Sequence, residues 1–171
     1  SLRLLRRYAD YINLNPHFQV VTPVDQKRII KEAIRKLNIT LDKDVTEAFI
    51  LKALSYRHQN KNDAFWLNPQ HRVGQVIQYY DEFCQAEQLL DFDHLIIRST
   101  QLFQTPFVRE NFVEHLDHIC VDEFQDTNYQ QILWLEALLG QKTGLTLVGD
   151  DDQSIYRFRG SDVTIMQSAQ N

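Results

Sequence analysis

The chain has 171 residues, a formal net charge of −5, 43% hydrophobic residues and 24% charged residues. This is the composition of a folded chain of one domain or slightly more, and it excludes a disordered tail or a coiled coil. The two cysteines, Cys84 and Cys120, are far apart in the sequence. We expect both to be reduced core thiols of a cytoplasmic protein rather than metal ligands or a disulfide. No apolar run reaches the roughly 18 residues of a membrane span, so we expect no membrane partner.

The charge is unevenly distributed along the chain. Residues 1–80 contain 13 Lys and Arg against 7 Asp and Glu, whereas residues 81–171 contain 5 against 16. A basic half can face a phosphate backbone, and clustered carboxylates can hold a cation. The alternative is an ordinary solvated surface in each half. None of the five glycines precedes a lysine, so the Gly-x-x-x-x-Gly-Lys-Ser/Thr phosphate loop does not occur in these 171 residues. Because the chain begins at Ser1, without Met, we expect it to be a segment of a longer protein.

Helical patterns cover the first 105 residues. The first predicted helix is a basic amphipathic stretch over Ser1–Asn13. Thr22 followed by Pro23 predicts the N-cap and first position of a second helix. The apolar residues of this second helix recur at helical spacing and predict one buried face, formed by Ile30, Ala33, Ile34 and Leu37.

Three more helices and a loop follow in chain order. A helix capped by Asp44 is expected to extend to about His58, and the polar segment 59–68 reads as a loop. Asp91 is expected to cap a helix that ends near Phe103, and Pro106–Leu116 predicts a shorter one. Between the loop and Asp91, an apolar stripe predicts a long buried helix through Val73, Val76, Ile77, Tyr80, Phe83 and Cys84.

The pattern changes after this helical region. The apolar runs 119–121 and 145–148 predict two strands, separated by a helix over 128–139 whose apolar face includes Ile132, Leu135, Leu138 and Leu139. Strand, helix and strand within about 30 residues predict the βαβ unit of a parallel sheet. Sites in such sheets lie beyond the carboxyl ends of the strands. We therefore expect four polar residues to converge at one edge: Asp122, Glu123, Asp150 and Gln153.

The acids that follow the first strand have two interpretations. Asp122, at the tip of a buried strand, can hold Mg²⁺, and Glu123 beside it can orient or deprotonate an attacking water. Alternatively, Asp122 or Asp126 is simply the N-cap of the following helix.

Three sequence motifs resemble those of one protein family. Asp122–Asn128 reads Asp-Glu-Phe-Gln-Asp-Thr-Asn and resembles motif II, the Walker B element, of the UvrD/Rep/PcrA family of superfamily 1 DNA helicases. Gly149–Asp162 resembles motif III of that family. Asp91–Leu95 reads Asp-Phe-Asp-His-Leu and resembles the Asp-Phe-Asp-Asp-Leu element upstream, with His94 in place of an acid.

The resemblance implies a mostly helical α/β fold. A partial RecA-like parallel sheet of the P-loop NTPase type is expected together with a helical insertion subdomain. Residues 1–20 would form a helix leading out of the RecA-like core, residues 21–85 the helical subdomain called 1B, and residues 86–171 part of domain 1A with motifs II and III.

The resemblance also implies roles for individual residues. Asp122 would bind Mg²⁺, Glu123 would activate the hydrolytic water, and Gln153 would contact the γ-phosphate of ATP. Asp150 would support the nucleotide site from a second layer. The resemblance further implies that single-stranded DNA is contacted by Tyr156, Phe158 and Arg159. Aromatic rings can stack on any base, and an arginine can pair with the phosphate backbone. For the two aromatic residues, core packing is the alternative.

On this basis we expect a fragment of an ATP-dependent 3′-to-5′ DNA helicase, with ATP and Mg²⁺ as cofactors and single-stranded DNA as partner. DNA repair is one pathway in which such proteins act. The chain by itself is not expected to hydrolyse ATP, and an incomplete sheet would favour oligomerisation through its open edge. Two alternatives are a non-catalytic DNA- or protein-binding module and a piece of a RecB/AddA-like helicase–nuclease subunit.

Overall fold

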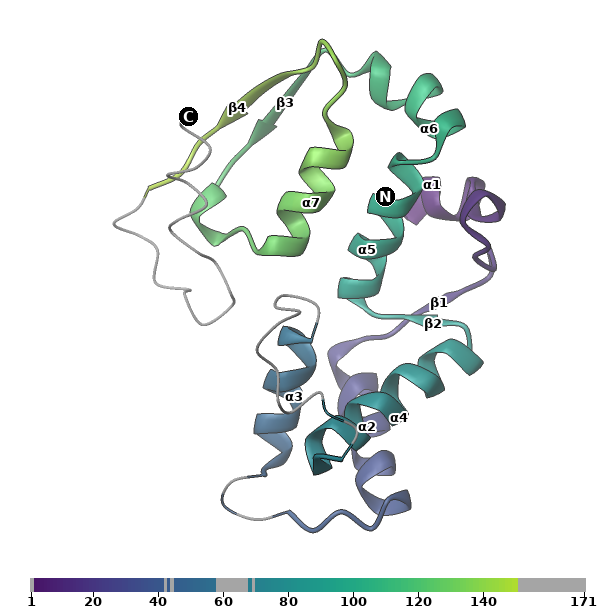
Figure 1. Cartoon of the computed structure of the whole chain (residues 1–171), viewed down its shortest axis with the longest axis vertical. Helices are drawn as coiled ribbons and strands as arrows, with labels where there is room; N and C mark the ends of the chain where they lie inside the picture. Colours follow the sequence, from purple (N-terminus) through teal and green to yellow (C-terminus); the bar gives the residue numbers. More distant parts are fainter. Residues whose placement is uncertain (1, 42, 44, 58–67, 69, 151–171) are drawn as a thin grey trace. The chain divides into compact units, whose positions relative to one another are not determined.

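The structure is a computed structural model that describes residues 2–41, 43, 45–57, 68 and 70–150 (Figure 1). It divides into two units. One is His17–His94, and the other combines the described residues up to Pro16 with those from Leu95 onward. Helices dominate both units, and each contains a small parallel sheet, so the expected mostly helical α/β class is confirmed. None of the helices in the described ranges has the length and apolar character needed to cross a bilayer.

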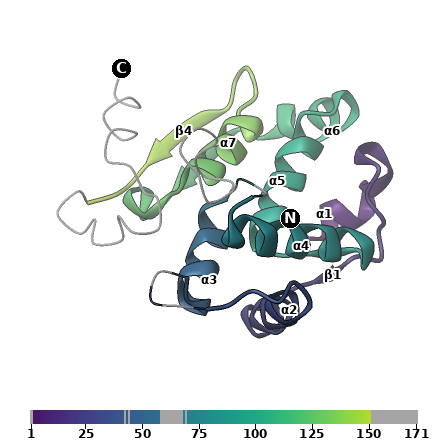
Figure 2. The ribbon, with the colours of Figure 1, turned by 60° about the horizontal axis from the view of Figure 1, so that its bottom comes forward.

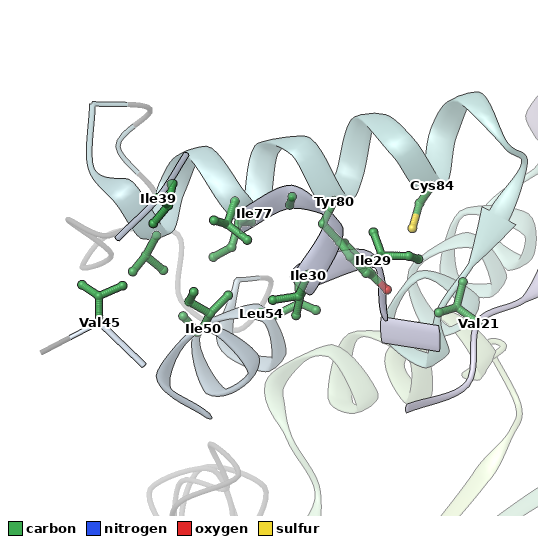
Figure 3. Packing of buried hydrophobic residues seen from close by; sticks show 14 residues of the cluster. Val21, Ile29, Ile30, Ile39, Val45, Ile50, Leu54, Ile77, Tyr80 and Cys84 are labelled. Atoms are coloured by element: carbon green, nitrogen blue, oxygen red, sulfur yellow. The ribbon is translucent and has the colours of Figure 1, made fainter. Parts of the chain in front are cut away.

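Three helices form the body of the unit His17–His94. They are α2 (Pro23–Lys36), α3 (Glu47–Tyr56) and α4 (Arg72–Ala86), and each packs against the other two (Figures 1 and 2). The apolar side chains that point between them make one continuous core (Figure 3). Burying these aliphatic side chains is the main favourable contribution to the stability of this unit.

The core confirms most of the predicted helix faces. All six residues of the α4 stripe belong to it, five fully buried and Phe83 partly buried. On α2, Leu37 is 39% exposed and not buried as predicted, because the helix ends at Lys36 and the chain turns away there. Burial raises the pKa of the Cys84 thiol to about 11, which keeps this sulfur protonated and unreactive at neutral pH.

Side-chain caps begin these helices. The Thr22 hydroxyl accepts from the Asp25 N–H at 3.3 Å while the Asp25 carboxylate accepts from the Thr22 N–H at 3.1 Å, which confirms the predicted cap as a reciprocal capping box. The expected start of α3 at Asp44 is wrong. Thr46 caps that helix by accepting from the Phe49 N–H at 3.1 Å. Asp44 itself and residues 59–67 of the predicted loop lie outside the described residues.

A short parallel sheet interrupts the helical region. β1 (Gln19–Val20) pairs with β2 (Leu89–Leu90), so the prediction of helices alone over the first 105 residues is wrong here. Two-residue strands are too short for an alternating pattern to appear in the sequence, and only the pairing of distant segments creates them.

A buried ion cluster joins the end of α3 to α4 and to the start of α5 (Phe92–Phe103). Arg57 is 6% exposed, and its Nη2 donates to Asp91 Oδ2 at 2.7 Å. The Arg57 Nε lies 3.2 Å from Asp81 Oδ1, and its Nη1 lies 3.8 Å from Asp93 Oδ2. The Tyr80 hydroxyl donates to Asp91 Oδ2 at 3.0 Å. One guanidinium therefore fastens three segments of the unit together.

Asp91 is the most strongly held carboxylate of this cluster. Its Oδ1 accepts from the His94 N–H at 2.9 Å, which confirms the predicted cap of α5. Burial alone would raise the pKa of Asp91, but the hydrogen bond from His94 and the charge of Arg57 outweigh it and hold that pKa far below its usual value. Burial raises the pKa of Asp93, which Arg57 approaches less closely.

The other unit contains most of the remaining elements. The predicted N-terminal helix is divided into α1 (Leu2–Arg7) and the 3₁₀ turn η1 (Ala9–Ile12), and the predicted helix from Pro106 is divided into α6 (Pro106–Asn111) and η3 (Val113–His115). Phe103 at the end of α5 contacts Trp134 of α7 (Tyr129–Leu138) edge to face, with ring centroids 5.9 Å apart. This aromatic contact fixes α7 beside α5 within the unit.

We predict that Asp91→Asn lowers the free energy of unfolding by about 3 kcal/mol at pH 7, because Arg57 stays buried without its closest anion. The folded-state pKa of Asp91 is depressed, so its contribution is fully present above its usual value of 3.8 and is lost as the pH falls below that value. The stability difference between wild type and Asp91→Asn should therefore shrink in acid. Urea unfolding between pH 7 and pH 3 measures it.

Asp93→Asn is the matched control, since it makes the same substitution in the same helical turn. It should cost much less at pH 7, because the raised pKa of Asp93 shows that its ionised form is disfavoured in the folded state. Equal losses for the two variants would contradict the assignment of Asp91 as the principal partner of Arg57.

Candidate functional site

The candidate site begins with two paired strands. β3 (His118–Val121) runs parallel to β4 (Gly144–Leu147), with Val121 opposite Leu147, and α7 connects them (Figure 1). The predicted βαβ unit is confirmed. At the start of this pair, a Cβ on Gly144 would lie 2.3 Å from His118 Nδ1, so this register requires a glycine or a displaced histidine ring.

One expectation about these strands is wrong. Cys120 is a free thiol, as predicted, but it is exposed and not a core residue. Side chains alternate between the two faces of a strand, and the burial of β3 alternates between exposed and half-buried positions with His118 and Cys120 on the exposed face. A run of apolar residues in the sequence did not distinguish a strand buried on both faces from one buried on a single face.

Backbone pairing continues past the ends of both strands. The Val148 N–H donates to the Val121 carbonyl at 2.8 Å, and the Phe124 N–H donates to the Val148 carbonyl at 2.9 Å. These two bonds hold the segment after β4 against the turn that follows β3. Asp122 and Glu123 lie in that turn, and both are exposed. The carboxyl ends of the two strands therefore meet at one edge, as parallel pairing requires.

Glu123 has an unusual backbone conformation. Its φ and ψ are 52° and 41°, in the left-handed region that glycine and asparagine usually occupy. Such a conformation costs about 1–3 kcal/mol and persists where the surroundings impose it. Here the Asp122 carboxylate accepts from the Glu123 N–H at 3.0 Å, and the next N–H is held by Val148. A glutamate, and not a glycine, therefore occupies a left-handed position at the end of β3.

Gln125 connects the two strand ends through its side chain. It is 7% exposed and lies in the 3₁₀ turn η4 (Phe124–Asp126). Its Nε2 donates to the Glu123 carboxylate, and its Oε1 accepts from the Asp150 N–H at 3.0 Å. Three of the residues expected to converge thus do so in the structure: Asp122, Glu123 and Asp150.

A pocket of about 300 Å³ opens beside these acids. It is lined by Val121, Asp122, Glu123, Asp126, Thr127, Gln131, Trp134 and Leu135. Asp126 Oδ1 is buried and has no hydrogen-bond partner among the described residues. An unsatisfied carboxylate oxygen in a half-open pocket calls for a partner such as water or a bound cation.

The donor set is suitable for magnesium. No three His, Cys, Asp or Glu side chains within the described ranges are grouped closely enough to hold a metal by themselves. Mg²⁺ rarely uses such a cage, and it is usually bound by one or two carboxylates together with waters and substrate phosphates. The exposed carboxylate of Asp122, whose Oδ1 accepts from the Glu123 N–H, is the candidate ligand of this kind.

The alternative interpretation of the acids as helix caps is wrong. Asn128 caps α7: its side chain accepts from the Gln131 N–H at 3.0 Å, and the Gln131 side chain accepts from the Asn128 N–H at 2.9 Å. Neither Asp122 nor Asp126 is needed to begin that helix. Their carboxylates are therefore available to the pocket.

Four predicted site residues lie outside the described residues: Gln153, Tyr156, Phe158 and Arg159. Two residues beside these acids were not predicted as site residues: Gln125 was not singled out in the sequence, and Asp126 was considered only as a helix cap. Their signal was present, because both lie within the motif that resembles motif II. The sequence did not reveal that Gln125 is buried between the two strand ends, or that Asp126 has an oxygen without a hydrogen-bond partner among the described residues.

The comparisons with known proteins agree with this geometry. The family model described as the UvrD/REP helicase N-terminal domain matches residues 1–171. DNA helicase II of Escherichia coli is 34% identical over 174 residues, and ATP-dependent DNA helicase PcrA of Staphylococcus aureus is 34% identical over 168 residues. These alignments cover 96% and 95% of the chain, and 24% and 23% of the relatives. DNA helicase II of Haemophilus influenzae is 33% identical over 96% of the chain.

The chain therefore belongs to the UvrD/REP helicase family, and it corresponds to that family's N-terminal domain model. It spans about a quarter of the length of the curated relatives it matches. The resemblance seen in the three motifs is confirmed at the level of the family.

We predict that Asn128→Ala lowers the free energy of unfolding by about 1 kcal/mol, because α7 loses the side-chain acceptor that its capping box offers to the Gln131 N–H. Asn128→Asp keeps an acceptor oxygen at the cap and is the matched control, with stability close to wild type. Urea unfolding followed by circular dichroism compares them. An Asn128→Ala variant as stable as the control would show that the cap contributes little.

Proposed function

We propose that this chain is part of an ATP-dependent DNA helicase that moves 3′ to 5′ along single-stranded DNA. The observation that carries the proposal is the meeting of Glu123 and Asp150 at the ends of two parallel strands, joined through Gln125, in a chain of the UvrD/REP helicase family. Relatives named DNA helicase II and PcrA support a helicase parent over a non-catalytic binding module or a RecB/AddA-like subunit.

The two units correspond to proposed parts of such a protein. We assign β3, α7 and β4 to a RecA-like parallel sheet of the P-loop NTPase type, within domain 1A. Residues 21–85, which supply the three helices of the unit His17–His94, are assigned to the helical insertion 1B, with residues 1–20 leading toward it and residues 86–171 assigned to domain 1A. The aliphatic core of that unit supports its assignment as a separately packed insertion.

Hydrolysis would take place at the strand ends. Asp122 would hold Mg²⁺ together with the phosphates of ATP, and the ion would supply neutralisation of the charge that develops on the phosphates. Glu123 would orient the attacking water and accept its proton. Asp150, whose N–H is held by the buried Gln125 amide, would support the nucleotide site from behind. Gln153 would contact the γ-phosphate.

The DNA contacts are assigned to the segment after Asp150. Tyr156 and Phe158 would stack on bases, which every base permits because each has a π-face, and Arg159 would pair with the phosphate backbone. Contacts of this kind are tolerant of sequence, as translocation along DNA requires.

We predict that Glu123→Gln, introduced into the longer protein that carries this segment, lowers kcat for DNA-stimulated ATP hydrolysis by about 10²-fold or more, since the base that accepts the proton is lost. The KM for ATP should change little, because the substitution removes a group that acts in the transition state. Steady-state phosphate release measures both constants.

Glu110→Gln is the matched control, because Glu110 is an exposed glutamate on α6 in the same unit. It should leave both constants near wild type. If Glu123→Gln hydrolysed ATP as fast as this control, Glu123 would not be the base.

The 171-residue chain by itself is predicted to show no ATP hydrolysis. It contains no Gly-x-x-x-x-Gly-Lys-Ser/Thr sequence, and phosphoryl transfer depends on positioning and charge neutralisation by that loop. A malachite-green assay with Mg²⁺-ATP and single-stranded DNA tests this. Phosphate release that depends on Glu123 would overturn the prediction.

A further inference from the structure

The Gln125 side chain occupies a position that no motif role explains. It is buried in the turn η4, between Glu123, two positions after β3, and Asp150, three positions after β4. Both ends of its amide are in use: the Nε2 group donates to the Glu123 carboxylate, and Oε1 accepts from the backbone N–H of Asp150 at 3.0 Å.

A carboxamide makes this pair of bonds in its neutral form. The bond to Glu123 requires a donor and the bond to Asp150 requires an acceptor, and the glutamine side chain carries one of each at its tip. A methionine of similar length offers neither. An asparagine has the same groups on a shorter stem, which cannot span both partners from the same backbone position.

The backbone and the side chain of Glu123 are held by different groups. Strand pairing and the Asp122 carboxylate hold its backbone, including the left-handed φ of 52°. Within the described ranges, the Gln125 amide is the one group that hydrogen-bonds to its carboxylate. An exposed glutamate otherwise samples many rotamers, so the direction of this carboxylate depends on the buried amide.

We propose that Gln125 is a positioning residue for ATP hydrolysis. It orients the Glu123 carboxylate toward the attacking water. Through the same amide, this orientation depends on the position of the Asp150 backbone. If the backbone shifts at Asp150, the Gln125 amide that accepts from its N–H shifts with it. The Glu123 carboxylate is bound to the same amide, so the segment after β4 and the proton acceptor move together. This inference rests on the proposed function, because it assumes that Glu123 accepts the proton.

The test is a double-mutant cycle in the longer protein that carries this segment. Gln125→Met is expected to lower kcat for DNA-stimulated ATP hydrolysis by about 10-fold to 100-fold, because a displaced catalytic group loses most of its advantage. The KM for ATP should stay within about threefold of wild type. In the Glu123→Gln background the same substitution should have almost no further effect on kcat, since Gln125 acts through the group already removed.

A residue that merely supports the fold would give a different result. Its loss would lower kcat by the same factor in both backgrounds, and that outcome would overturn the proposal. Gln104→Met, at an exposed position just after α5, is the matched control for exchanging an amide for a thioether and should behave as wild type. Gln125→Asn provides a second variant that keeps a polar group in the buried turn. It should show the same loss of kcat and the same absence of effect beside Glu123→Gln.

The outcomes also separate this proposal from the proposed function. If the wild-type protein does not hydrolyse ATP in the presence of single-stranded DNA, the helicase assignment fails. If it does, and Glu123→Gln is impaired while Gln125→Met and Gln125→Asn keep wild-type kcat, the helicase assignment stands and the role of Gln125 is refuted.

Discussion

The parallel pairing of β3 with β4 is the constraint on which the candidate site depends. Its register places Val121 opposite Leu147, and two further backbone bonds through Val148 extend the pairing beyond the strands. Acids separated by 27 positions in the chain, Glu123 and Asp150, are thereby brought within reach of one amide. If the register shifted by one residue, the side chains of a strand would change faces and this convergence would be lost.

The site and the helical unit use buried polar groups in different ways. In the helical unit, Arg57 is surrounded by three carboxylates and the ring of Tyr80, and the cluster fastens three segments by charge. At the strand ends, the buried connector is the neutral Gln125, and the carboxylates face a pocket. A buried charge must be compensated where it lies, whereas a neutral amide leaves the neighbouring carboxylate free to act on a ligand.

Glu123 shows how function and stability compete at one position. Glycine would adopt its φ of 52° without strain, and the sequence instead places there the side chain that the proposed hydrolysis needs. The hydrogen bonds that the Glu123 and Phe124 N–H groups donate to Asp122 and Val148 offset this conformational strain locally. The strained residue therefore lies directly beside backbone that is held by strand pairing.

The sequence by itself determined the helices with strong periodicity, the two strands, the cap at Thr22 and the family, because these depend on local pattern and on contiguous motifs. Tertiary structure alone decided the pairing of β1 with β2, the exposure of Cys120 and the partners of Arg57 and Gln125. The strand pairing, the Arg57–Asp91 ion pair and the Gln125–Asp150 bond join segments distant in the chain, and the exposure of Cys120 depends on which elements cover its strand. Periodicity records which face of an element is apolar, and it carries no information about which distant group will lie against it.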